Sequence, residues 1–155
     1  MAANRAHGIL VLAEVSDGKL AGVAQELLGA GRRLAEAADE EVAAAVLGCQ
    51  VGESAQEAIA YGADKVYLID DPLLASPQVD AYAAALEGLC RDMQPNIVLL
   101  GKTSLGVEVG PRLAFRLGTA LASDCTDLRI DPESKALIMT RPVFGGNAML
   151  DMICD

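Results

Sequence analysis

Apolar residues in this chain fall into two alternating patterns. Four short continuous runs are rich in Val, Ile, Leu or Ala and end at a Ser, Gly or Asp, which is typical of buried strands. These runs are residues 9–15, 42–47, 65–69 and 97–100. Between the runs, apolar residues recur every three or four positions, as in helices that bury one face. Continuous apolar strands joined by helices predict a parallel sheet that is covered on both faces.

The predicted helices carry recognisable boundary signals. Ser54 and Glu57 match the capping-box pattern, in which both side chains satisfy free N–H groups at a helix start. Pro111 has no backbone N–H, so it fits within the first four residues of a helix. We therefore expect the helix that follows the strand at 97–100 to begin near Val107 or Glu108.

The pattern changes after residue 117, where short strand-like runs follow one another without helices between them. These runs are residues 119–124, 127–130, 136–144 and 148–154. We expect antiparallel strands, added after residue 118 on the edge of the parallel sheet. The predicted fold class is α/β, with three layers and a mostly parallel, Rossmann-like sheet. The sequence stops within a strand-like run, so we expect residues 1–155 to be a single domain cut from a longer protein.

Composition narrows the function classes. Of the 155 residues, 52% are hydrophobic and only 3% aromatic, which allows an aliphatic core of one domain. The formal net charge of −10 would repel a nucleic-acid backbone, so we expect no nucleic-acid partner. No apolar run approaches the roughly 20 residues that cross a bilayer, and the N-terminus does not resemble a secretory signal. We expect a cytoplasmic protein without membrane insertion.

Cysteine and histidine are too sparse for a metal or nucleophilic site. Cys49, Cys90, Cys125 and Cys154 are far apart and lie in apolar segments, which favours buried thiols over metal ligands or disulfides. His7 is the only histidine. We expect neither catalytic residues nor a metal site in this chain.

The loop after residue 100 is the main candidate for ligand binding. Its sequence GKT, residues 101–103, resembles the end of a phosphate-binding P-loop, but the full pattern needs a glycine where Asn96 stands. The helix N-terminus beyond this loop could still hold an anion through free N–H groups. Alternatively, Thr103 or Ser104 simply caps that helix. The nucleotide-loop candidates are Gly101, Thr103, Ser104 and Gly106.

A second candidate site is the glycine-rich turn near the end of the chain. Two consecutive glycines beside an asparagine let the backbone come close to another surface, although they also suit a simple hairpin turn. The partner-contact candidates are Arg141, Gly145, Gly146 and Asn147. Asp124 lies near a strand end without a second titratable group placed to work with it, so we expect a turn or capping role for it.

Four segments together resemble a known family. They are ILVLAEVSDGKL at residues 9–20, YGADKVYLID at 61–70, the stretch from NIVLLGKTSLG to GPRLAFRLGTALASDC at 96–125, and RPVFGGNAML at 141–150. In this order they are similar to the N-terminal domain of electron transfer flavoprotein alpha subunits, over nearly the whole chain.

The resemblance implies a fold like that of adenine nucleotide alpha hydrolases and a heterodimer with a beta subunit. It also implies FAD in the full-length protein, bound mainly by a separate C-terminal domain, so we expect no cofactor in this chain. In the family, AMP or a second flavin binds the beta subunit instead. One departure is Val107-Glu108, where the family often has an Arg-Asp pair, so any role of that arginine is in doubt.

On this basis we expect a structural and docking domain of an electron carrier. Dehydrogenases would donate electrons to the intact complex, and a separate acceptor would receive them. The alternative is a free-standing adenine-nucleotide-binding module of the universal-stress or pyrophosphatase-like class. The pyrophosphatase form needs an SGGxDS-like loop, where this chain has EVSDG at residues 14–18. Titration with AMP or ATP distinguishes the two interpretations.

Overall fold

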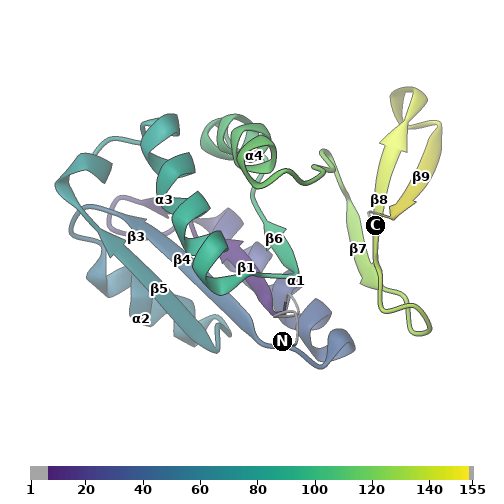
Figure 1. Ribbon diagram of the computed structural model, residues 1–155, viewed down its shortest axis with the longest axis horizontal. Coiled ribbons are helices and arrows are strands. Elements are labelled where there is room, and N and C mark those ends of the chain that lie inside the picture. Colours follow the sequence, from purple (N-terminus) through teal and green to yellow (C-terminus); the bar gives the residue numbers. More distant parts are fainter. Residues whose placement is uncertain (1–6, 154–155) are drawn as a thin grey trace.

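A four-stranded parallel sheet forms the centre of the computed structural model, which describes residues 7–153 (Figure 1). The strands are β1 (Ile9–Leu12), β4 (Val42–Gly48), β5 (Lys65–Asp70) and β6 (Ile97–Leu99). Their order across the sheet is β5-β4-β1-β6, with every neighbouring pair parallel. The four strands predicted from the apolar runs are therefore confirmed.

Two helices cover each face of this sheet. One face carries α1 (Gly22–Ala38) and α2 (Gly52–Ala60), and the other carries α3 (Val79–Met93) and α4 (Ser104–Leu117). A 3-10 turn, η1 (Pro72–Leu74), leads into α3. The predicted three-layer α/β architecture with a mostly parallel sheet is confirmed.

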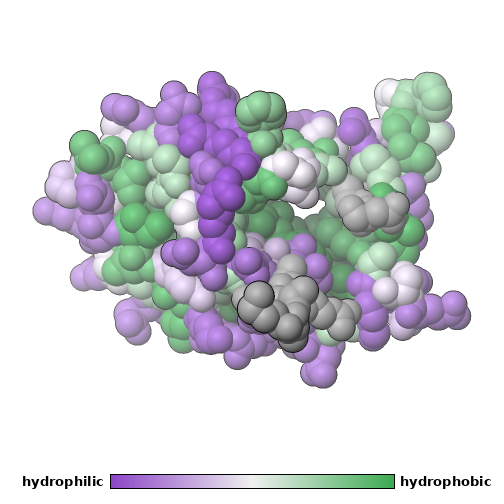
Figure 2. Space-filling model, in the orientation of Figure 1, coloured by the Kyte–Doolittle hydropathy of each residue, from purple (hydrophilic) through white to green (hydrophobic). Residues whose placement is uncertain are grey.

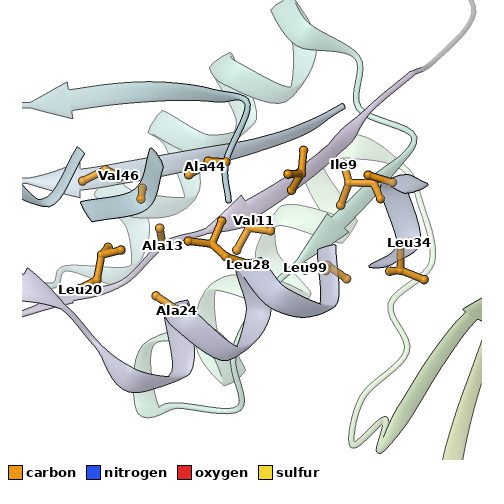
Figure 3. Close-up of a cluster of buried hydrophobic side chains, with 14 of the residues drawn as sticks. Ile9, Val11, Ala13, Leu20, Ala24, Leu28, Leu34, Ala44, Val46 and Leu99 are labelled. Atoms are coloured by element: carbon orange, nitrogen blue, oxygen red, sulfur yellow. The ribbon is translucent and has the colours of Figure 1, made fainter. Parts of the chain in front are cut away.

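The central strand β1 supplies alternate side chains to two separate cores. Ile9 and Val11 point toward α1 (Figure 3). Leu10 and Leu12 belong to the core under α3 and α4, and all four side chains are completely or almost completely buried. Since neighbouring side chains of a strand face opposite sides of the sheet, a continuous apolar run is what a sheet covered on both faces requires. The core is aliphatic, as the composition predicts.

A short hairpin interrupts the first predicted strand. The strands β2 (Val15–Ser16) and β3 (Lys19–Leu20) pair with each other, and Asp17 and Gly18 form the turn between them. Both turn residues have positive φ (52° and 75°), as in a two-residue type I′ turn. Strand β1 therefore ends at Leu12, before the end of the apolar run at residues 9–15.

The predicted capping box at Ser54 and Glu57 is wrong, because α2 begins at Gly52 and both side chains point to the hairpin instead. Ser54 Oγ donates to the Gly18 carbonyl oxygen (3.2 Å), and Glu57 Oε2 accepts from the Leu20 backbone N–H (2.8 Å). These bonds fasten the β2–β3 hairpin onto α2. The two side chains therefore make tertiary hydrogen bonds instead of the helix-capping bonds that the local sequence pattern predicted.

A second, antiparallel sheet follows α4. It contains β7 (Asp127–Ile130), β8 (Leu137–Val143) and β9 (Ala148–Ile153), in that order, and a 3-10 turn η2 (Phe144–Gly146) joins the last two. Leu128, Ile130 and Leu137 pack against the core under α1. The antiparallel strands are confirmed, but they form a sheet of their own rather than an extension of the parallel one (Figure 1).

The strand predicted at residues 119–124 is wrong. Gly118 ends α4 in the left-handed conformation, and the Thr119 N–H bonds back to the Ala114 carbonyl oxygen (3.0 Å). The Leu121 side chain then lies over Gly110 of α4, with methyl carbons 3.6 Å from the position of a Cβ there. The segment follows the helix surface and pairs with no strand. No helix within residues 7–153 is long and apolar enough to cross a membrane.

One glycine pair in α1 tests the packing of this helix on the sheet. A Cβ at Gly31 would lie 2.9 Å from Val42 Cγ2, whereas a Cβ at Gly29 would meet nothing within 4 Å. Gly31→Ala is expected to be less stable than Gly29→Ala by about 1–3 kcal/mol, because the gain in helix propensity is shared and only Gly31→Ala overpacks the core. Urea unfolding of both variants measures the difference. Equal free energies of unfolding would contradict this packing.

Candidate functional site

The loop after β6 lies at the point of the sheet where ligands usually bind. The strand order changes direction at β1, between β4 and β6, and open α/β sheets bind ligands at the carboxyl ends of the strands beside such a point. Here the sequence places Glu14 shortly after β1 and Gly101–Thr103 directly after β6. The four nucleotide-loop candidates are thus at the predicted location.

The loop and the start of α4 touch each other. A Cβ at Gly106 would lie only 1.9 Å from the Gly101 carbonyl oxygen, and a Cβ at Gly101 would lie 2.6 Å from Val23 Cγ2. Both positions therefore require glycine. These glycines allow close packing within the protein, whereas a P-loop uses its glycines to surround a phosphate.

Thr103 is the N-cap of α4. Its hydroxyl oxygen accepts from the Gly106 backbone N–H (2.9 Å), and its hydroxyl donates to Glu14 Oε1 (2.7 Å). Ser104 is the first helical residue. Of the two alternatives left open by the sequence, capping by Thr103 is what the structure shows, and one of the free N–H groups at this helix start is already used.

The prediction that α4 begins near Val107 or Glu108 is wrong, because the helix starts at Ser104 and holds Pro111 in its interior. A proline inside a helix leaves a carbonyl one turn earlier without its usual donor. The Arg112 guanidinium donates to the Glu108 carbonyl oxygen at 2.9 Å in this region. That carbonyl is the ordinary acceptor of the Arg112 backbone N–H, whereas Pro111 leaves the Val107 carbonyl without its donor, so the side-chain bond does not replace the lost one.

Glu14 brings a carboxyl group to the same place. The group is partly buried, and this burial raises its pKa, while the hydrogen bond from Thr103 acts in the opposite direction. A phosphate that approached the start of α4 would meet this acidic group. Lys102, the cation of the loop, is engaged elsewhere in an ion pair with Asp124. The arrangement disfavours an anion at this site.

The glycine-rich turn forms a second candidate site. An open hollow of about 600 Å³ lies at the end of the β8–β9 hairpin. Its lining residues are Asp124, Arg141, Pro142, Val143, Phe144, Gly145 and Gly146. The structure thus brings three of the four partner-contact candidates together. The fourth, Asn147, holds the turn by donating from its side-chain amide to the Phe144 carbonyl oxygen (2.9 Å).

The backbone of this turn requires its glycines. Phe144, Gly145 and Gly146 all have positive φ, at 52°, 68° and 89°. A residue with a side chain pays roughly 1–2 kcal/mol for this region, which glycine does not. A Cβ at Gly145 or Gly146 would meet nothing within 4 Å, so the two glycines are needed for conformation and leave the surface above them open.

The hairpin also exposes apolar side chains (Figure 2). Their exposed fractions are 83% for Phe144, 57% for Met149, 54% for Ile153 and 45% for Leu150. From Pro142 to Leu150 the sequence contains no charged residue. An uncharged apolar hairpin is unusual on a chain with a net charge of −10, and clustered apolar surface of this kind marks interaction sites. We call these four residues the hairpin patch; in the strand register Leu150 lies on one face of the hairpin and Met149 and Ile153 on the other, so a partner that covers the patch must enclose the hairpin.

A polar cluster that the sequence analysis missed holds the antiparallel sheet together. Asp151 on β9 accepts from Thr140 on β8 (2.6 Å) and from Arg129 on β7 (2.6 Å). The hydrogen bond from Thr140, followed by that from Arg129, lowers the pKa of Asp151. Thr140 and Asp151 are directly opposite in the strand register. Only the pairing of β8 with β9 reveals that these two residues meet, and the sequence of a single strand does not contain that information.

The cysteines differ in their burial. Cys90 is buried and borders a pocket of about 300 Å³ between the C-terminal ends of α3 and α4, and burial raises its pKa to about 11. Cys49 and Cys125 are only half-buried, and Cys154 lies outside the described residues. Across residues 7–153, no group of three or more His, Cys, Asp or Glu side chains could hold a metal ion.

Comparison with known proteins gives a consistent result. Residues 9–155 match the family model of the electron transfer flavoprotein domain. The chain is 45% identical, over 147 residues, to an electron transfer flavoprotein subunit alpha of Megasphaera elsdenii, and 42% identical, over 148 residues, to that of Clostridium acetobutylicum. It is 37% identical, over 173 residues, to the acryloyl-CoA reductase electron transfer subunit beta of Anaerotignum propionicum.

These matches cover 95%, 96% and 97% of the chain, but only 44%, 44% and 47% of the three relatives. The chain therefore spans less than half the length of the curated relatives that it matches.

Thr103→Val tests the cap on α4. The variant loses both the oxygen that accepts from the Gly106 N–H and the donor to Glu14. It is expected to lose about 1–2 kcal/mol in free energy of unfolding, while Thr103→Ser, which keeps the hydroxyl, loses less than about half of that. Denaturant unfolding of both variants measures this. A valine variant as stable as the serine variant would show that the hydroxyl contributes nothing.

Glu14→Gln tests the buried carboxyl group through its pH dependence. A pKa that is raised in the folded state means that the ionised carboxylate destabilises the fold, fully so above the folded pKa. Glutamine keeps an oxygen that accepts from Thr103 but carries no charge. Relative to this variant, the wild type is expected to gain stability as the pH falls from 7 through the folded pKa toward the ordinary value of 4.5. Unfolding curves recorded over this range that stay parallel would contradict the assignment.

Proposed function

The chain belongs to the electron transfer flavoprotein domain family, and on that premise we propose that it is the N-terminal structural and docking domain of an alpha subunit. In the intact protein it would form a heterodimer with a beta subunit. That complex would carry electrons on FAD from dehydrogenases to an acceptor. This domain would position the flavin-bearing part of the complex and perform no chemistry of its own.

The observation that carries the proposal is the hairpin patch. Phe144, Met149, Leu150 and Ile153 leave large apolar side chains in contact with water. Burying one such side chain completely contributes roughly 1.5–3 kcal/mol, so covering most of the patch would supply several kcal/mol to an association. The absence of charge between Pro142 and Leu150 means that little polar surface would have to be desolvated.

FAD would be held mainly by a second domain, in the length that the relatives have beyond the matched region. The start of α4 is poorly suited to a flavin or nucleotide phosphate, since Thr103 caps it and the Glu14 carboxyl group lies beside the cap. These residues are therefore not part of the proposed path of electron transfer. The same observation speaks against the free-standing nucleotide-binding module, for which AMP should bind at micromolar concentration.

Other parts of the proposal are supported by the relatives' names alone. One relative is named as an electron transfer subunit of acryloyl-CoA reductase, which indicates that the enzyme served differs between members of the family. Association with dehydrogenases, with an acceptor and with the beta subunit is thus proposed by similarity. A cytoplasmic location remains a prediction from the sequence.

The test compares two exposed phenylalanines in the full-length alpha subunit. Phe144 lies in the hairpin patch and is 83% exposed, while Phe115 lies on α4 and is 87% exposed. Phe144→Ser is expected to raise the Kd for the beta subunit about 10-fold or more, because it removes a large apolar contact. Phe115→Ser makes the same chemical change outside the patch and should alter the Kd by less than about 2-fold.

The Kd is measured by calorimetric titration of purified subunits, after circular dichroism has shown that both variants fold. Equal affinities of the two variants would remove the hairpin from the interface.

A further inference from the structure

Arg141 differs from the other arginines of the described part of the chain. Five of them form ion pairs and a sixth donates to a backbone carbonyl oxygen: Arg32, Arg91, Arg112, Arg116 and Arg129, and then Arg33. Arg141 has no ion pair within 4.0 Å, and its Nε is buried without a hydrogen-bond partner. Among residues 7–153 it is the only buried side-chain nitrogen or oxygen in this condition.

Arg141 sits at the edge of the hairpin patch. It lies opposite Leu150 in the β8–β9 register and on the same face of β8 as Met139 and Val143, which are two residues away on either side. Its side chain also lines the hollow beside Gly145 and Gly146. The aliphatic part of the Arg141 side chain thus lies on the face of the hairpin that carries Leu150. The hollow is open above the turn.

Within residues 7–153, no group accepts a hydrogen bond from Nε. Asp124 lines the same hollow, but its carboxylate pairs with Lys102. The hydrogen bond from Lys102 is the main cause that lowers the pKa of Asp124, and Arg141 adds only a weaker attraction from a distance. A buried N–H without an acceptor costs free energy, so native structures rarely keep one without a reason.

We propose that Arg141 receives a carboxylate side chain of the partner subunit, which enters the hollow at the end of the β8–β9 hairpin. The inference rests on the proposed docking function and adds the chemistry by which the partner is recognised. The two terminal nitrogens of the guanidinium are not buried, unlike Nε, and they form a planar pair of donors that matches the two oxygens of a carboxylate. A lysine at this position could not present that geometry.

The surroundings of Arg141 strengthen such a pair. Pro142, Val143 and Phe144 border the hollow with apolar groups, and their coverage by a partner would exclude water from the ion pair. Lower local polarity increases the attraction between opposite charges. The open space over Gly145 and Gly146 gives the incoming side chain room to approach. The hairpin patch would supply affinity, and Arg141 would select the acidic partner group.

The experiment measures the Kd of full-length alpha subunit variants for the beta subunit at low and high salt. Arg141→Met removes the donors but keeps an apolar stem, and Arg141→Lys keeps the charge without the planar fork. The matched control is Arg33→Met, which makes the same change of net charge at an exposed site on α1. Thermal unfolding confirms that each variant is folded.

Relative to Arg33→Met, the Arg141→Met variant is expected to bind about 30-fold more weakly or worse, since one member of a buried charge pair is lost. Its Kd should also depend less on salt than that of the wild type. Arg141→Lys is expected to bind at least about 5-fold more weakly than the wild type. This lysine variant decides the question if Arg141→Met does not fold.

Three results would overturn the proposal. They are a Kd of Arg141→Met within about 2-fold of the Arg33→Met control, weaker binding with an unchanged salt dependence, or wild-type affinity of Arg141→Lys. If Phe144→Ser weakens the complex while the Arg141 variants do not, the docking function stands and the carboxylate pairing fails. If neither has an effect, the docking surface itself is wrong.

Discussion

The organisation of this protein depends on how much apolar surface its own elements can cover. The parallel sheet is covered on both faces, by α1 and α2 on one and by α3 and α4 on the other, and its edge strand β5 is partly exposed. The antiparallel sheet is covered only in part, since Leu128, Ile130 and Leu137 reach the core under α1 while the far end of β8 and β9 does not. The polar cluster around Asp151 keeps the three strands together despite this. A hairpin with exposed apolar side chains is the consequence, and we propose that a second protein covers it.

The carboxyl end of the parallel sheet shows the opposite condition. There the chain has the strand–loop–helix arrangement at which similar α/β folds bind nucleotides, but groups of the protein itself occupy the space where a ligand would bind. Gly106 touches Gly101, Thr103 caps α4, and Glu14 adds an acidic group next to the cap. We propose that a scaffold with this site closed and the hairpin patch open serves assembly rather than ligand binding.

Sequence alone predicted the features that depend on local periodicity. Continuous apolar runs identified β1, β4, β5 and β6, and the changed pattern after residue 117 identified the antiparallel strands. The sequence prediction failed where contacts between residues far apart in the sequence determine the structure. Ser54 bonds to the β2–β3 hairpin, and Leu121 packs on α4 instead of extending a strand. The sequence singled out Arg141 as lying near the turn, but only the structure shows that its Nε lacks an acceptor.

The most direct test of the docking account is hydrogen–deuterium exchange of the full-length alpha subunit, alone and in complex with the beta subunit. The account predicts that amides of β8, η2 and β9 exchange more slowly in the complex, because the partner covers that hairpin. Amides of residues 101–106 should exchange at the same rate in both states. Unchanged exchange throughout β8 and β9, with protection elsewhere on the domain, would contradict the account.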